Sequence, residues 1–166
     1  MANTLKVLAY AIRMEEEGEK FYRENIDKVS NQDTKEVLIQ LADMESEHVE
    51  LLKKEFESIS KGEKIKGLVP GKVAKKIFTE RKKSEKVTEA EGESALGDLA
   101  ILRMAYLIED DLAQFYKKAA ENASDKNIKE TYKILANWEI EHRNMLHKIY
   151  DERFHDSWFD MGFSPF

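Results

Sequence analysis

The sequence predicts an all-α protein, an antiparallel four-helix bundle, and two observations carry this prediction. Glycine (7) and proline (2) are scarce among 166 residues, while Glu, Lys, Leu and Ala are abundant, which favours long helices over sheets with their many turns. Residues 5–54 also recur at residues 99–148, and each copy reads as two long helices joined by a short polar break. With 42% apolar residues the chain can form a substantial core, and we expect residues 1–166 to be one domain.

The repeat has a constant offset of 94 residues and contains no gap. Its polar breaks read SNQD in the first copy and SDKN in the second. Identical residues recur throughout both copies, among them the pairs Phe21 and Phe115, Tyr22 and Tyr116, Glu45 and Glu139, and His48 and His142. The chain is therefore predicted to be a doubled helical hairpin.

The first hairpin is predicted to contain helices at residues 4–29 and 34–59. Neighbours on one face of a helix are spaced by three, four or seven residues, and this spacing defines the inward stripe of each helix. Asp33 is the predicted N-cap of the second helix, with Glu36 three residues later as its partner in a capping box. The two inward stripes are Leu8, Ala11, Glu15, Gly18 and Tyr22, and Leu38, Leu41, Glu45, His48 and Leu52.

A long crossover, residues 60–94, follows the first hairpin. Pro70 and its glycine neighbours break the helical periodicity, and residues 73–83 are predicted to form a short helix of their own. Two antiparallel hairpins joined by one long connection are typical of the ferritin-like variety of four-helix bundle. Between Lys61 and Lys86 there are ten basic residues against three acidic ones. We interpret this excess as solvated surface and expect no nucleic-acid partner, because the rest of the chain is acidic.

The second hairpin is predicted to contain helices at residues 95–123 and 128–153. Asn127 is the predicted N-cap of the last helix, again with a glutamate, Glu130, three residues later. Both inward stripes repeat the pattern of the first hairpin, an apolar face interrupted near its middle. They run Leu102, Ala105, Glu109, Leu112 and Tyr116, and Tyr132, Leu135, Glu139, His142 and Leu146.

Other acidic and imidazole side chains fall off these stripes. Glu47 and Glu141 recur in the repeat but are predicted to lie at the surface, as are His147 and His155. The final segment, residues 154–166, is rich in aromatic residues. These aromatic side chains either cover their own bundle or anchor a partner subunit, and we expect a homodimer.

Composition excludes several classes of function. The absence of cysteine excludes disulfides, zinc ribbons, iron–sulfur clusters and thiol nucleophiles. The chain has no signal-peptide pattern and no uncharged apolar stretch approaching about 18 residues, so we expect no membrane partner and a cytoplasmic location. The net charge of −6 gives no reason to expect a polyanion as the main partner.

Six polar residues near the middle of the four stripes are the candidate site. In an antiparallel bundle they should meet at one level, where four carboxylates would carry a charge of −4 inside a dry core. The stripes offer no lysine or arginine at that level, whereas two divalent cations would neutralise the carboxylates. Glutamate oxygens with one imidazole per metal suit iron or manganese. A glutamate from each of two helices and Glu-x-x-His from each of the others is the ligand pattern known from di-iron carboxylate bundles.

On these motifs the sequence resembles the rubrerythrin-like branch of the ferritin-like di-iron proteins. AIRMEEEGEKFY and AYLIEDDLAQFY resemble its glutamate-bearing helices, and LADMESEHVELL and LANWEIEHRNML resemble its Glu-x-x-His helices. The resemblance implies a site with two Fe ions, or Mn, that reacts with dioxygen or hydrogen peroxide. It also implies that Tyr22 and Tyr116 hydrogen-bond ligand carboxylates across the bundle. The implied metal ligands are Glu15, Glu45, His48, Glu109, Glu139 and His142.

The chain departs from that family in two respects. Full rubrerythrins carry a rubredoxin-type iron held by four cysteines, and this chain has no cysteine, so catalysis would require a separate electron donor, a reductase or rubredoxin-like protein. They also use an additional glutamate one turn after the third helix's ligand, where this chain has Leu112. This difference favours a more symmetric site with six ligands.

Three functions remain open from the sequence. The first is an oxidoreductase of the peroxidase or ferroxidase type, with no catalytic group beyond the metal ligands and no organic cofactor. The second is a protein that binds or stores iron or another metal without turnover. The third is a helical scaffold that holds no metal.

Overall fold

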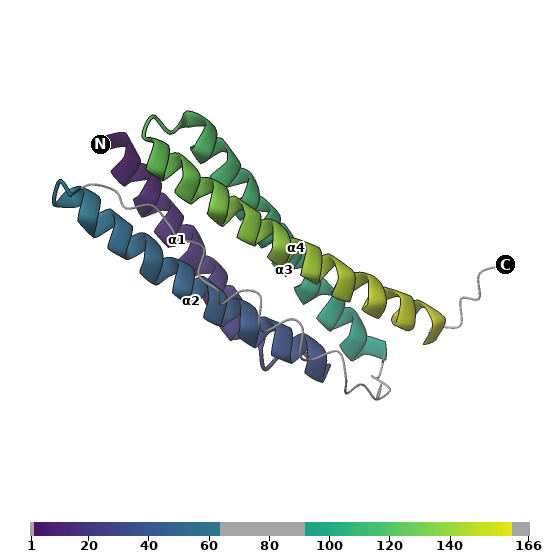
Figure 1. Cartoon of the computed structure of the whole chain (residues 1–166). Coiled ribbons are helices and arrows are strands. Elements are labelled where there is room, and N and C mark those ends of the chain that lie inside the picture. Colours follow the sequence, from purple (N-terminus) through teal and green to yellow (C-terminus); the bar gives the residue numbers. More distant parts are fainter. Residues whose placement is uncertain (1, 64–91, 161–166) are drawn as a thin grey trace.

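The computed structural model describes residues 2–63 and 92–160, which form two helical hairpins (Figure 1). The first hairpin consists of α1 (Ala2–Asn25) and α2 (Gln32–Ser60), and the second of α3 (Gly92–Asn122) and α4 (Lys126–Asp160). No strand occurs in these residues, so the prediction of an all-α four-helix bundle is confirmed. None of the described helices is long and apolar enough to cross a membrane.

Helix α1 ends four residues earlier than predicted. The Asn25 side-chain amide donates to the carbonyl of Phe21 at 2.7 Å, and the chain then turns through residues 26–28. The following loop is held by Asp98 on α3, whose carboxylate accepts hydrogen bonds from Ser30 N (2.9 Å), Ser30 Oγ (3.1 Å) and Asn31 N (2.8 Å). A buried acidic group thus joins the turn of the first hairpin to the start of the second.

The predicted N-caps were wrong by two residues in both hairpins. Asn31, not Asp33, caps α2 by accepting a hydrogen bond from Thr34 N at 3.0 Å. The residue at the matching position of the repeat, Asp125 rather than Asn127, accepts from the backbone N–H groups at the start of α4. Capping at Asn31 places Asp33 inside the first turn, where its negative charge interacts favourably with the helix dipole. Neither observed cap has a glutamate three residues later, so Glu36 and Glu130 are not at the capping-box position relative to these caps.

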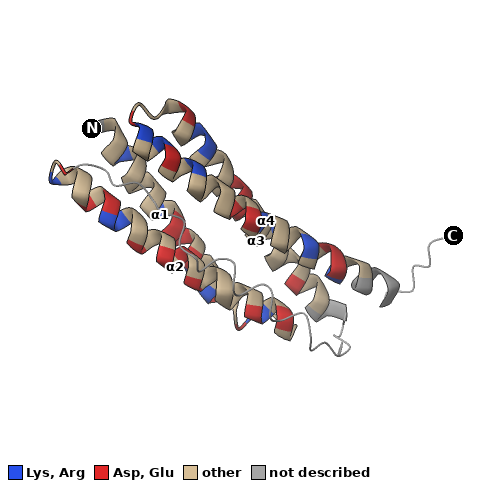
Figure 2. Ribbon diagram, viewed as in Figure 1, with Lys and Arg blue, Asp and Glu red and all other residues tan. Residues whose placement is uncertain are grey.

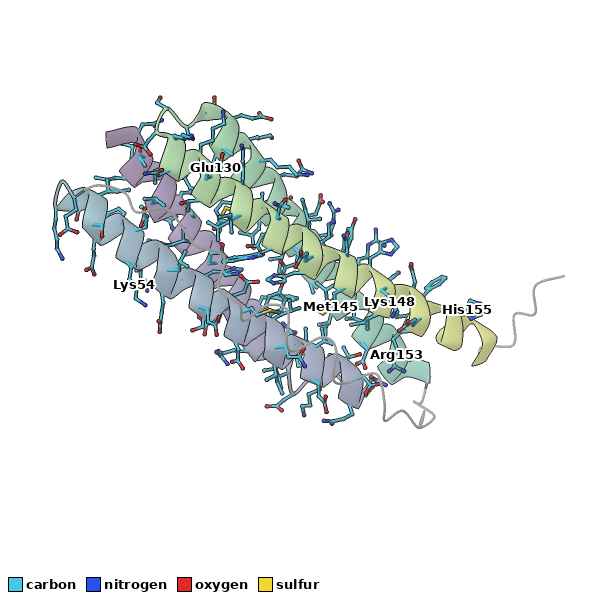
Figure 3. The ribbon with its side chains drawn as sticks, viewed as in Figure 1. Lys54, Glu130, Met145, Lys148, Arg153 and His155 are labelled. Carbon is cyan, nitrogen blue, oxygen red and sulfur yellow. The ribbon has the colours of Figure 1, made fainter. Side chains whose placement is uncertain are left out.

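Helices α2 and α4 end differently from each other. Gly62, at φ 74°, adopts the left-handed conformation that follows many helix C-termini, and α2 stops at Ser60. Helix α4 continues to Asp160, seven residues beyond its predicted end, and projects past its neighbours in Figure 1. Arg153 of α4, labelled in Figure 3, pairs with Asp33 of α2 at 2.6 Å.

Part of the sequence prediction falls outside the described residues. The predicted short helix at residues 73–83 lies there, as does most of the crossover. Residues 154–160 of the predicted tail belong to α4, and residues 161–166 are also outside the described part of the chain.

Among the described residues, the core consists of two apolar clusters. One includes Leu8, Ala11, Leu112 and Tyr132, and the other includes Tyr22 and residues from both hairpins. Leu8 and Ala11 lie before Glu15 on α1, and Tyr22 lies after it. The two clusters therefore lie on either side of the level of Glu15, near the middle of the helix. Lys, Arg, Asp and Glu residues recur along the ribbons of all four helices (Figure 2).

Candidate metal centre

The six polar residues predicted to face inward do so. All four glutamates have no exposed surface, and the two histidines are 6% and 5% exposed. By contrast, Glu47 and Glu141 are exposed, as are His147 and His155, as predicted. The inward set is Glu15 on α1, Glu45 and His48 on α2, Glu109 on α3, and Glu139 and His142 on α4.

The six side chains form two overlapping groups of four. In each group one ligand atom per residue can be chosen so that these atoms lie within 4.8 Å of one another. Glu45 and Glu139 belong to both groups, so their carboxylates lie between the two positions. The first group is Glu15, Glu45, His48 and Glu139, and the second is Glu45, Glu109, Glu139 and His142.

The two groups have nearly the same geometry. Nδ1 of His48 lies 3.1 Å from Glu45 Oε2, 3.2 Å from Glu139 Oε1 and 3.6 Å from a Glu15 oxygen. Nδ1 of His142 lies 3.1 Å from Glu139 Oε2, 3.4 Å from Glu109 Oε2 and 3.6 Å from Glu45 Oε1. The offset of 94 residues that relates the hairpins in sequence therefore relates two sites in space.

Each outer glutamate is held by a tyrosine from the other hairpin. The hydroxyl of Tyr116 donates to Glu15, and the hydroxyl of Tyr22 donates to Glu109. Both tyrosines are fully buried. The cross-bundle hydrogen bonds implied by the family resemblance are present in the structure.

The sequence matches the Rubrerythrin family over residues 6–150. The chain belongs to the rubrerythrin family. Its fold is similar to that of a hypothetical protein from Pyrococcus furiosus, with a TM-score of 0.68 and 23% identity over 93% of this chain and 94% of the other. At that identity the similarity shows the fold alone. No functionally curated protein matches the sequence.

Burial and mutual repulsion set the protonation of the glutamates in this rubrerythrin-family site. Burial is the largest cause that raises the pKa of Glu45 well above its usual value, and the charges of the neighbouring carboxylates raise it further. Burial also raises the pKa of Glu109 to about 7, against the opposing effect of His142. Burial alone would raise the pKa of Glu139, but the two imidazoles hold it below its usual value. Without a metal ion, the cluster thus retains protons that ordinary surface carboxylates would have lost.

The two imidazoles respond in the opposite way to burial. Burial lowers the pKa of His48, but the charge of Glu139 and the hydrogen-bonding contacts with Glu139, Glu15 and Glu45 together outweigh burial, and the pKa lies well above its usual value. For His142, burial likewise lowers the pKa, and the charge of Glu109 together with hydrogen-bonding contacts with Glu109, Glu139 and Glu45 raises it well above its usual value. Metal ligands must be deprotonated histidine and carboxylate groups, so an incoming cation would displace these protons.

Several buried oxygens have no hydrogen-bond partner among the described residues. In the centre they are Glu15 Oε2, Glu45 Oε1, Glu109 Oε2 and both oxygens of Glu139, each of which lies 3.1–3.6 Å from a histidine Nδ1 without accepting a well-directed hydrogen bond. A buried acceptor without a partner is costly, and a cation is the partner that can serve several at once. The donor set is rich in oxygen with one imidazole nitrogen per group, which fits divalent iron or manganese. The residues present therefore fit a pair of metal ions.

Sequence reasoning missed two neighbours of the centre. Trp138 stacks on His48 with ring centroids 5.1 Å apart. Arg143, which follows His142, pairs at 2.7 Å with Asp110, which follows Glu109, and so ties α3 to α4 beside two candidate ligands. Both could have been sought in the sequence, because each directly adjoins a candidate ligand.

Proposed function

We propose that this rubrerythrin-family protein is a di-iron oxidoreductase that reacts with dioxygen or hydrogen peroxide. The observation that supports this proposal is the pair of overlapping four-residue groups that share Glu45 and Glu139. Shared carboxylates bring two cations close together, and a paired site is suited to a two-electron reaction at one oxidant molecule.

The chain's own residues have distinct roles in this proposal. Glu45 and Glu139, which belong to both groups, would hold both ions, and His48 and His142 would each hold one. Tyr116 and Tyr22 orient Glu15 and Glu109, since a carboxylate that accepts a fixed hydrogen bond presents its other oxygen in a fixed direction. The apolar clusters on both sides exclude bulk water. When bound, the iron pair supplies the electrons and shares the charge that develops on the oxidant.

Electrons for turnover must come from outside the cluster. The chain has no cysteine and therefore no four-cysteine iron site, so we assign reduction to a separate donor protein, a reductase or a rubredoxin-like protein. The homodimer, the cytoplasmic location and the absence of a nucleic-acid partner stay predictions.

Rapid mixing of the ferrous protein with hydrogen peroxide or dioxygen tests the proposal. We expect iron oxidation, followed by the absorbance of ferric iron, to be much faster than that of free ferrous iron. Glu139→Gln should abolish this acceleration, whereas the matched control Glu141→Gln, two residues away at the surface, should retain it. Oxidation no faster than that of free iron would rule the proposal out.

The second candidate is a protein that binds or stores metal without turnover, and the lack of any cysteine-bound electron donor in the sequence favours it. Elemental analysis of the purified protein gives metal in both cases and separates both from a helical scaffold that holds none. Slow oxidation of a fully loaded protein would favour the storage function.

A further inference from the structure

The two candidate imidazole ligands differ in the rings that pack against them. In other respects they are alike, because each Nδ1 lies 3.1–3.6 Å from oxygens of three glutamates and both side chains are buried. The centroids of the His48 and His142 rings are 5.6 Å apart, and the two planes are 9° from parallel. The indole of Trp138 also packs on His48, at 5.1 Å and 11° from parallel. Among the described aromatic rings, His48 thus has two nearly parallel neighbours and His142 has one.

This difference comes from one break in the repeat. Trp138 precedes Glu139 on α4, and at the offset of 94 residues the first hairpin has Met44, which precedes Glu45 on α2. Both residues are half-buried, and Trp138 packs against one apolar cluster while Met44 packs against the other. The two residues therefore occupy matching places in the two hairpins, with an indole in one and a thioether in the other.

A stacked indole restricts a torsion that a histidine ligand must hold. Rotation about the Cβ–Cγ bond of histidine is broad and roughly two-fold, so an unconstrained imidazole samples many ring planes. The 3.1 Å contact between Nδ1 of His48 and Glu45 selects the edge of the ring that faces the carboxylates. The parallel indole then confines the ring plane, since a rotated imidazole would collide with the indole. A ring that is ordered before the metal arrives loses less conformational freedom when the metal binds.

From this geometry we propose that Trp138 is a positioning residue that makes the two metal positions unequal, so that the group containing His48 binds the first ion. Immobilising a side chain in advance is equivalent to about three- to tenfold in affinity. The indole offers no ligand atom and acts through the His48 ring. The proposal rests on the paired metal site of the proposed function, but not on its reaction with an oxidant.

A double-mutant cycle on metal binding tests this role. Manganese(II) alone is added to the metal-free full-length protein, and calorimetry measures its affinity. In His142→Gln protein His48 is retained, and there Trp138→Met should weaken binding of the first ion about three- to tenfold. In His48→Gln protein the indole has lost its partner ring, so Trp138→Met should change the affinity by less than about twofold. Equal losses in both backgrounds would indicate general packing and would overturn the proposal, as would no loss in either.

Two single variants test whether stacking is the cause. Trp138→Phe keeps a ring that can stack on His48, so its first-ion affinity should be close to that of the unsubstituted protein. Asn137→Ala, an exposed change at the neighbouring position, is the control and should bind manganese normally. A loss in Trp138→Phe as large as that in Trp138→Met would contradict stacking.

Met44→Trp tests the same idea with all six candidate ligands in place. It gives the group containing His142 an indole at the matching position, so the second manganese ion should bind more tightly and the two affinities should converge. Electron paramagnetic resonance at one manganese ion per chain should then show more paired ions and fewer single ions than in the unsubstituted protein. An unchanged difference between the two affinities, in a variant whose circular dichroism shows the folded bundle, would overturn the proposal.

The positioning role and the proposed function fail in distinguishable ways. Paired metal binding that is the same with and without the indole would overturn the role of Trp138 alone. An effect of Trp138 on metal binding, together with slow oxidation of the ferrous protein, would overturn the proposed reaction alone. No binding of manganese or ferrous iron would overturn both.

Discussion

Tyr116 on α3 and Glu15 on α1 are 101 residues apart in sequence, yet a hydrogen bond joins them inside the bundle. The matching pair, Tyr22 and Glu109, forms the same bond in the opposite direction between the hairpins. The two bonds make each half of the centre depend on a side chain from the other hairpin. Correct assembly of the two hairpins therefore fixes the orientation of both outer carboxylates.

Tyr116→Phe should weaken metal binding more than it weakens the fold. It removes the hydroxyl that orients Glu15 while it retains the buried ring, and loss of such a supporting hydrogen bond typically lowers metal affinity by about 10–100-fold. Titration with manganese, followed by the bound fraction, measures this change. Tyr10→Phe, which removes a hydroxyl from an exposed ring, is the control and should bind normally. Equal affinity in both variants would show that the hydrogen bond has no part in metal binding.

Glu45→Gln should separate metal binding from folding. Because burial and neighbouring carboxylates raise the pKa of Glu45, the metal-free protein favours the protonated form of this side chain, and glutamine has nearly the same shape and no charge. We expect the melting temperature of the metal-free variant to stay close to that of the unsubstituted protein, whereas paired metal binding is lost. Calorimetry and elemental analysis measure the two effects.

The matched control for that variant is Glu47→Gln, which changes an exposed carboxylate on the same helix. It should bind the full complement of metal. A large loss of melting temperature in metal-free Glu45→Gln would mean that Glu45 is ionised and held by other groups in the fold.

The repeat made the centre predictable from the sequence. Glu-x-x-His at Glu45 and at Glu139 lies on faces that helical periodicity marks as core, and the hairpin offset places both motifs at one level. The N-cap residues were less predictable, because each polar break contains two Asn or Asp residues that could cap the helix. Only the path of the loop determines which of the two does so. That path depends on Asp98, a residue 67 positions away from Asn31 that binds its backbone N–H. Trp138 was missed for a related reason, since stacking on His48 is a contact between helices that periodicity does not specify.

Asp98→Ala should destabilise the bundle without altering the metal centre. Asp98 is 3% exposed, and its removal leaves Ser30 N, Ser30 Oγ and Asn31 N without their acceptor. Hydrogen bonds to a charged group make the expected loss about 2–3 kcal/mol in the free energy of unfolding. Urea denaturation of the metal-free protein measures it. Asp111→Ala, an exposed change on the same helix, should alter that free energy by less than about 0.5 kcal/mol; similar losses in both variants would contradict the role of Asp98.

The metal-free and metal-loaded proteins should respond to pH in opposite directions. The folded-state pKa of Glu109, about 7, lies above the value near 4.5 of an exposed glutamate. Between these values the folded metal-free protein holds more protons than the unfolded chain, so its free energy of unfolding falls as pH rises. The raised pKa values of His48 and His142 act in the same direction. Metal ions compete with these protons, so metal binding strengthens as pH rises and stabilises the folded state further.

Thermal melts between about pH 5 and pH 7, with and without manganese, measure this difference. The increase in melting temperature caused by manganese should grow with pH, while the melting temperature of the metal-free protein declines. Glu109→Gln removes one of the titrating groups, so its metal-free protein should show a shallower decline. Displacement of protons by metal makes the metal affinity depend on pH. The same manganese-induced increase in melting temperature at every pH would therefore show that the protons of the cluster do not compete with metal.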